Sequence, residues 1–305
     1  MLEKHLLSRY PGDSHARVVV REFVGRICRR YIELGLADPN FEDNLCCGSD
    51  ARFWQRLSEA LLAHELLVVG FDLQPSRDGP DMLIKYEGRN IWIEVICPEP
   101  TGLPVDWLVP KFNEVVNFPH EAILLRWTAA IKEKAEKLLG NPAKNCAGYL
   151  EKGVVKPDDA YVIAINGRRL RDVFPSLDGI SQFPFVVEAV FAVGPYAIKL
   201  DRDTLERVDA AHKHRPVILK PNGSPVPAYT FLDPAFRQVS AIWATDIDEC
   251  SILGNAKPMA VVHNPNATNP ISQEFLPANW DYVASECGED EYVLDQRTGR
   301  LNSPA

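Results

Sequence analysis

The chain has 305 residues, of which 46% are hydrophobic and 25% charged, proportions typical of a globular protein with room for a sizeable core. No run of about 18 apolar residues occurs, which argues against a transmembrane helix, and the first residues lack the pattern of a signal peptide. The net charge of −9 argues against a surface coated in basic residues for non-specific nucleic-acid binding, although it leaves room for a local basic groove.

The seven cysteines are odd in number and include no CxxC pair. This usage is typical of reduced thiols, and it predicts a cytoplasmic protein without a disulfide framework. The sequence leaves the oligomeric state open, a homodimer included.

Helical periodicity first appears over residues 17–36. Residues 38–50 are predicted to form a loop that ends in Ser49, a residue suited to capping the next helix. An amphipathic helix is predicted over residues 50–69 and is closed by Gly70.

Two short runs, residues 82–86 and 91–97, are rich in Ile and aromatic side chains, which favours β-strands. Between them, Glu87-Gly88 is suited to a two-residue hairpin turn. A long helix is predicted over residues 121–139.

Residues 161–167 and 186–194 are apolar runs that predict buried strands. Beyond residue 200 prolines and loops dominate, with strands predicted at 239–246 and 259–264. The last ~20 residues are polar and acidic and are expected to be loose at the surface.

No repeat, linker or shift in composition divides the chain. We therefore predict a single α/β domain over residues 1–305. It would consist of an N-terminal helical segment (1–49), a core (50–167) and a strand-rich extension that completes the domain (168–305).

Two carboxylates meet in the predicted hairpin. If Glu87-Gly88 is the loop, Asp81 lies opposite Glu94, with Cβ atoms ~4.5–5.5 Å apart. Two such carboxylates repel each other, and a divalent cation between them removes the repulsion; oxygen ligands suit Mg²⁺ or Mn²⁺. The alternative is that Asp81 caps a turn and Glu94 pairs with an arginine.

The order helix, hairpin, helix, with Pro80-Asp81 followed by Glu94 on the next strand, resembles the PD-(D/E)xK nuclease superfamily. The resemblance covers residues 50–167. It implies a restriction-endonuclease-like α/β fold, with a mixed central sheet flanked by helices. It also implies a third metal ligand on the preceding helix, where Glu59 matches and Glu65 is the alternative.

One residue departs from this pattern, because the lysine of the family is replaced by Ile96. Either another cation takes its place, or the fold has lost its chemistry. On the following helix Lys134 falls on the apolar stripe that faces the sheet, and Arg126 borders that stripe. These two are the candidate replacements, whereas Lys132 and Lys137 are expected nearer the outer face.

Two functions follow from this resemblance. The first is metal-dependent hydrolysis of phosphodiesters in nucleic acid, with DNA favoured over RNA. Glu59, Asp81 and Glu94 would hold Mg²⁺ or Mn²⁺, and Lys134 or Arg126 would act as the catalytic cation. The second is a catalytically inactive protein of the same fold that acts as a binding or regulatory module; Ile96 and the acidic net charge favour it.

Overall fold

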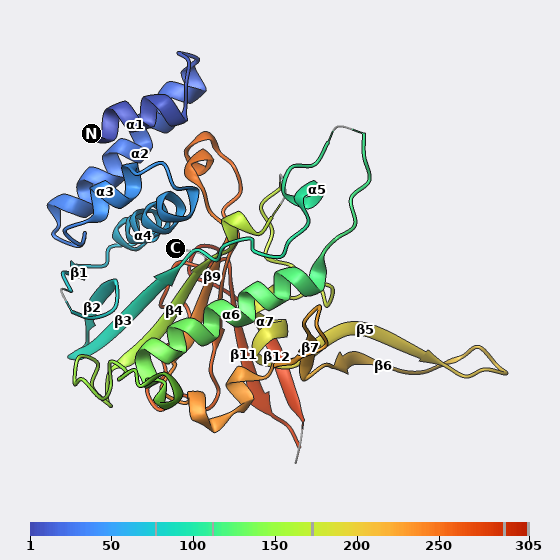
Figure 1. The fold of residues 1–305 in the computed structure, drawn as a ribbon. Helices are drawn as coiled ribbons and strands as arrows, with labels where there is room; N and C mark the ends of the chain where they lie inside the picture. Colours follow the sequence, from blue (N-terminus) through green and yellow to red (C-terminus); the bar gives the residue numbers. More distant parts are fainter. Residues whose placement is uncertain (77, 112, 172–173, 289–290, 304–305) are drawn as a thin grey trace.

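The computed structural model describes residues 1–76, 78–111, 113–171, 174–288 and 291–303. Within these residues a mixed sheet of eight strands forms the centre of the molecule, in the order β1-β2-β3-β4-β9-β10-β11-β12 (Figure 1). The strands are β1 (Leu73–Gln74), β2 (Met82–Tyr86), β3 (Arg89–Ile96), β4 (Ala160–Asn166), β9 (Ala241–Thr245), β10 (Met259–His263), β11 (Trp280–Glu286) and β12 (Tyr292–Thr298). The mixed α/β class is as predicted.

Helices cover both faces of this sheet (Figure 1). One face carries α1 (Leu2–Arg9), α2 (His15–Glu33), α3 (Phe41–Cys46) and α4 (Asp50–Val68), and the other carries α5 (Val105–Leu108), α6 (His120–Leu139) and α7 (Phe185–Val190). Short 3-10 turns lie at η1 (Pro142–Lys144), η2 (Gly167–Arg169), η3 (Thr230–Leu232), η4 (Pro234–Phe236) and η5 (Glu249–Leu253). None of the helices in the described ranges is both long and apolar enough to cross a membrane.

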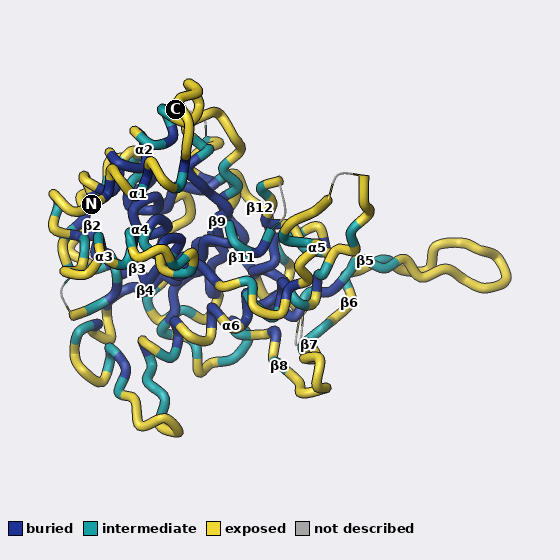
Figure 2. Tube along the Cα trace, turned by 45° about the horizontal axis from the view of Figure 1, so that its top comes forward, coloured by how far each residue is buried: buried dark blue, intermediate teal, exposed yellow. Residues whose placement is uncertain are grey.

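The side chains of β3 alternate between two hydrophobic cores. Ile93 and Val95 pack with the core under α1–α4, whereas Trp92 and Ile96 pack with the core under α6. This alternation follows from the pleat of a strand, which sends successive side chains to opposite faces. Glu94 has the parity of Trp92 and Ile96, and it is therefore directed at α6. The residues of the central strands β4, β9 and β10 are all buried, and Figure 2 shows this as dark blue in the middle of the molecule.

Local signals define the two helices that flank the hairpin. The Ser49 hydroxyl accepts a hydrogen bond from the backbone N–H of Arg52, as expected of an N-cap. Gly70, just beyond α4, has φ +91°, and Gly140 at the end of α6 has φ +83°. Both angles lie in the left-handed region, where glycine is favoured because it has no Cβ.

Two small hairpins stand outside the main sheet. Strands β5 (Val193–Leu200) and β6 (Arg207–His214) form an exposed arm that projects from the body of the molecule (Figure 2). Strands β7 (Val217–Leu219) and β8 (Pro225–Pro227) pair with each other and contact α6.

Three sequence predictions were wrong. Residues 186–194 are mostly the helix α7 rather than a strand, because Phe185–Val190 is buried on every side and its apolar run carries no periodicity. Within the last ~20 residues, which were expected to be loose, Tyr292–Thr298 forms β12 and pairs with β11 along seven residues. The predicted loop 38–50 contains the short helix α3.

Candidate functional site

Strand β3 extends beyond the start of β2, and this leaves part of its backbone without a partner strand. The register pairs Met82 with Ile93, so that Asp81, one residue before β2, falls opposite Glu94 as the hairpin predicted. The carboxylate of Asp81 accepts a hydrogen bond of 2.6 Å from the backbone N–H of Val95.

A second side chain, Gln55 of α4, completes this free edge. Its amide nitrogen donates to the carbonyl of Val95 (3.1 Å), and its amide oxygen accepts from the N–H of Cys97 (3.0 Å). Buried backbone groups require partners. Asp81 and Gln55 therefore supply the hydrogen bonds that a neighbouring strand would make. These bonds hold the Asp81 side chain at the end of β3, and they hold α4 against the same end of the strand.

Glu94 lies at the centre of a cationic cluster and is 1% exposed. Its Oε1 accepts hydrogen bonds from Lys134 Nζ at 2.8 Å and from Lys137 Nζ at 2.6 Å, both from α6. The hydroxyl of Tyr149 lies 3.3 Å from Oε2. Because α6 packs over the face of β3 that carries Glu94 and Ile96, its lysines reach the carboxylate from above the strand.

Glu59 approaches from α4 and is 2% exposed. Its carboxylate accepts hydrogen bonds from Gln55 Nε2 and from Arg56 Nη1, each at 3.0 Å. Glu65, the alternative on the same helix, is also buried, but it pairs with Lys257 at 2.8 Å. Glu59 therefore shares Gln55 with the end of β3, and Glu65 belongs to a separate ion pair.

The three carboxylates differ in their pKa values. Burial raises the pKa of Asp81 well above its usual value, and the charges of Glu94 and Glu59 raise it further. Burial also raises the pKa of Glu59, against the opposing effect of Arg56. Burial acts in the same direction on Glu94, but Lys134 and Lys137 outweigh it, so that the pKa of Glu94 lies below its usual value.

These pKa shifts bear on whether a metal ion would fit. Across the residues that the structure describes, no group of three or more His, Cys, Asp or Glu side chains is arranged to hold a metal ion. However, Mg²⁺ is commonly bound by one or two carboxylates together with water and substrate phosphate. Asp81 and Glu94 are two neighbouring carboxylates and would suit such a cation. A bound cation would offset the repulsion between their negative charges, which adds to burial in raising the pKa of Asp81.

A cavity of about 690 Å³, called here the site cavity, opens between α4 and α6. Gln55 and Ile96 line it, which places it next to the end of β3. Three arginines line it as well, Arg52, Arg56 and Arg126, together with two glutamates, Glu99 and Glu133. This is a polar cavity with a small excess of positive charge.

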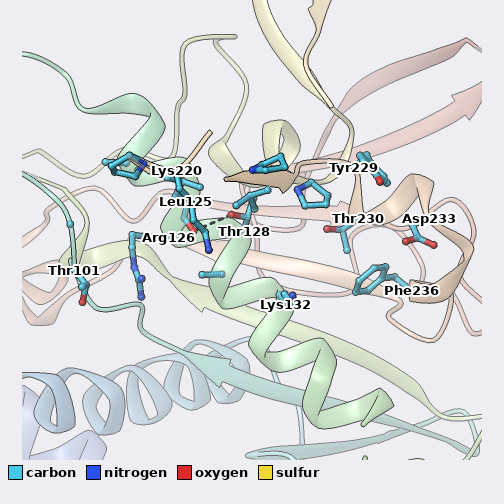
Figure 3. Close-up of a pocket in the computed structure, with 17 residues that line it drawn as sticks. Thr101, Leu125, Arg126, Thr128, Lys132, Lys220, Tyr229, Thr230, Asp233 and Phe236 are labelled. Atoms are coloured by element: carbon cyan, nitrogen blue, oxygen red, sulfur yellow. Dashed lines mark hydrogen bonds between the residues drawn. The ribbon is translucent and has the colours of Figure 1, made fainter. Parts of the chain in front are cut away.

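A second cavity of about 610 Å³, called here the side cavity, lies between α6 and the β7–β8 hairpin (Figure 3). Thr101 and Arg126 line both cavities. The two hollows are therefore neighbours along α6, with Arg126 at their junction.

The structure brings Glu59, Asp81, Glu94 and Lys134 into one electrostatic cluster, since each of the other three affects the pKa of Asp81. Arg126 lies earlier on α6, between the two cavities, and none of the described hydrogen bonds or ion pairs joins it to these carboxylates. Of the two cations that the sequence offered as replacements for the missing lysine, Lys134 is the one that contacts Glu94.

Sequence reasoning missed four residues of this site: Gln55, Arg56, Lys137 and Tyr149. Lys137 was expected nearer the outer face, and its side chain is indeed 45% exposed, yet its ammonium group reaches Glu94. Gln55 and Arg56 precede Glu59 by one turn of α4, a spacing that could have indicated their contact with it. Tyr149 carried no such signal, because it lies outside the regular elements.

Comparison of the chain with protein-family models, with curated proteins and with solved structures gave no match.

Proposed function

We propose that this protein is a metal-dependent phosphodiesterase that acts on nucleic acid, with DNA favoured over RNA, through a site of the PD-(D/E)xK kind in which the lysine has moved from β3 to α6. The observation that supports this most directly is the contact of 2.8 Å between Lys134 and Glu94. It supplies an ammonium group over the face of β3 on which Ile96 stands in the position of the family lysine.

Asp81 and Glu94 would hold Mg²⁺ or Mn²⁺, and Glu59 would support them from α4. The metal ion, when bound, lowers the pKa of a bound water and neutralises charge on the phosphate oxygens. The contribution of the chain is to hold these carboxylates in place, through the hydrogen bond of Asp81 to Val95 and through Gln55.

The two lysines have separate roles in this proposal. Lys134 is 5% exposed, and its ammonium group lies 2.8 Å from Glu94 Oε1, so that it places a buried positive charge beside that carboxylate. Lys137 is half exposed and can move between Glu94 and a phosphate group at the mouth of the site. Both would stabilise the negative charge that develops on phosphate oxygens during hydrolysis.

The proposal is tested by metal binding and by cleavage. We expect calorimetry to show Mn²⁺ binding to the wild type and weaker binding to Asp81→Ala and Glu94→Ala. In the presence of Mg²⁺ or Mn²⁺ the wild type should cleave DNA, and both variants should lose about a thousandfold or more of the rate. The reason is that a metal ion contributes several kcal/mol to the barrier and each 1.36 kcal/mol is a factor of ten.

A matched pair on α4 serves as a control. Glu59→Ala should reduce Mn²⁺ affinity and cleavage, whereas Glu65→Ala, which breaks a separate ion pair, should change neither per folded molecule. Cleavage that survives the loss of Asp81 would contradict the proposal.

The rival is a binding or regulatory protein on the same fold without catalysis. Its specific support is that two lysines already neutralise Glu94 and that no metal-holding group of three is found among the described residues. Absence of Mn²⁺ binding, together with absence of cleavage of single- and double-stranded DNA and RNA, would establish this rival.

A further inference from the structure

The side cavity is a mainly apolar cavity that adjoins the site cavity at Arg126. Its volume of about 610 Å³ falls within the ~300–1,000 Å³ that is typical of small-molecule sites. Figure 3 shows Thr101 and Arg126 at one end of it and Thr230, Asp233 and Phe236 at the other. Arg126 also lines the site cavity, so that its side chain can meet a ligand in either one.

The walls of the side cavity are suited to a flat, partly polar ring. Tyr229 and Phe236 contribute aromatic side chains. Pro225 and Pro227 of β8 give a wall whose backbone φ angles are fixed by their rings. Asp233 adds an acceptor at the far end. An apolar cavity with a few placed polar groups is the usual form of a site for a planar ligand.

Positive charge lies along the rim of the same cavity. Lys132 and Lys220 are exposed and line it, and Arg126 lies at the junction with the site cavity. Arg126 is half-buried and lines both cavities, so its guanidinium group can meet an anion at their junction.

We propose that the side cavity holds an unpaired nucleobase of the nucleotide next to the cleaved phosphate, and that Arg126 binds the phosphate between the two cavities. This inference rests on the proposed function, and it names the substrate class as single-stranded or locally unpaired nucleic acid. A base in a duplex cannot enter such a cavity unless it leaves its stack and its partner, which costs a few kcal/mol. Stacking on aromatic side chains stabilises the binding of a base that is already unpaired and unstacked.

The inference is tested by binding without catalysis. Fluorescence anisotropy in EDTA would compare a labelled single strand of mixed sequence, about 12 nucleotides long, with the same strand in a blunt duplex. We expect the wild type to bind the single strand at least tenfold more tightly, a difference of about 1.4 kcal/mol at 25 °C.

A variant that fills the side cavity tests whether nucleic acid binds there or elsewhere on the surface. Ala129 is exposed on α6 and lines the side cavity, so Ala129→Trp should fill it and weaken single-strand binding about tenfold. Ala143→Trp places the same side chain on the exposed turn η1, which lines neither cavity, and should have no effect. Tyr229→Ala should weaken binding about as much as Ala129→Trp. Because the two substitutions alter the cavity in different ways, the same loss of binding in both would not be explained by a folding defect in one of them.

The role of Arg126 has its own readout. Arg126→Met keeps most of the shape of the side chain and removes the charge. The slope of log K against log salt for the single strand should therefore become shallower by about 0.7, the value for one phosphate contact. An unchanged slope would overturn the assignment of Arg126 to a phosphate.

The outcomes distinguish this inference from the proposed function. If the wild type cleaves DNA but binds duplex as tightly as single strand, or if Ala129→Trp and Tyr229→Ala bind normally, the inference is overturned and the proposed function stands. If single strands bind in a cavity-dependent manner without any cleavage, the inference stands and the proposed function fails. Binding of neither nucleic acid overturns both and leaves the cavity to another kind of ligand.

Discussion

Two glutamates, Glu94 of β3 and Glu188 of α7, are both buried and both accept hydrogen bonds from positively charged or N–H groups. Glu188 of α7 is 0% exposed and accepts hydrogen bonds from His120 Nε2 (2.6 Å), Arg215 Nη2 (2.8 Å) and the N–H of Ser181 (2.7 Å). Burial tends to raise the pKa of Glu188, but His120 and Ser181 outweigh it, and the pKa lies below its usual value. The same balance holds at Glu94 with its two lysines.

The difference lies in the neighbours. At Glu94 a second and a third carboxylate, Asp81 and Glu59, are close enough for their charges to interact. Burial raises the pKa of Asp81, and the charges of Glu94 and Glu59 raise it further. At Glu188 the carboxylate meets one guanidinium group, that of Arg215, together with His120 and the N–H of Ser181. A buried, paired glutamate is therefore no sign of function by itself. An excess of carboxylates beside a polar cavity is the feature that supports a metal site.

The largest expected effect is on stability, at the matched cluster. Glu188→Ala leaves His120 and Arg215 without their carboxylate, and loss of one partner of a buried pair typically costs about 3–5 kcal/mol. Urea unfolding should show a decrease of this order, and cleavage per folded molecule should not change. A variant that stays fully stable but loses cleavage would show that the two clusters have been assigned the wrong way round.

The next effect is on rate, at the unmatched cluster. Lys134→Ala should reduce DNA cleavage by about 10- to 100-fold, the range found when groups next to metal ligands are removed. Mn²⁺ affinity should not decrease, since the variant removes a cation rather than a ligand. Lys137→Ala should have a smaller effect because that side chain is half exposed.

Lys152→Ala, at an exposed position outside both cavities, is the control for these lysine variants. Equal rates in Lys134→Ala and Lys152→Ala would mean that Lys134 serves only to neutralise Glu94.

The smallest expected effect is a gain in stability. Asp81→Asn keeps an oxygen for the N–H of Val95 and removes one of three interacting charges. Because the folded state raises the pKa of Asp81, its ionisation costs stability as the pH rises above the unfolded pKa of about 4. Without metal, the variant should therefore be more stable than the wild type by about 1 kcal/mol at neutral pH.

The gain from Asp81→Asn should disappear when the pH falls below about 4, where the unfolded state also binds the proton. Thermal unfolding in EDTA across this pH range measures it. A variant that is less stable than the wild type at neutral pH would mean that Asp81 contributes a favourable charge, as Glu188 does.

The elements around the site could largely be predicted from sequence. The Ser49 cap and the helix that follows it, the hairpin turn at Glu87-Gly88 and its register, and the inward direction of Lys134 all depend on neighbours within a few residues. Local periodicity and turn chemistry determine such features, and they placed Asp81 opposite Glu94 before any tertiary contact was known.

Other features were decided only by packing between distant segments. Whether residues 186–194 form a helix or a strand depends on what surrounds a run that is buried on all sides. The pairing of β12 with β11 brings a polar segment into the sheet, and the sequence of this segment has no apolar pattern that would predict a strand. The role of Gln55 arises because β3 extends beyond β2 and leaves the carbonyl of Val95 free.

The sequence by itself therefore determined the carboxylates, their register and the helix that covers them. The tertiary structure alone decided which cations meet Glu94 and where the cavities lie. A lysine side chain is long and flexible, so that Lys137 can start on the outer face of α6 and still reach a buried carboxylate across the strand. The reach of such a side chain depends on how closely a helix packs on a sheet, and no sequence pattern specifies that distance.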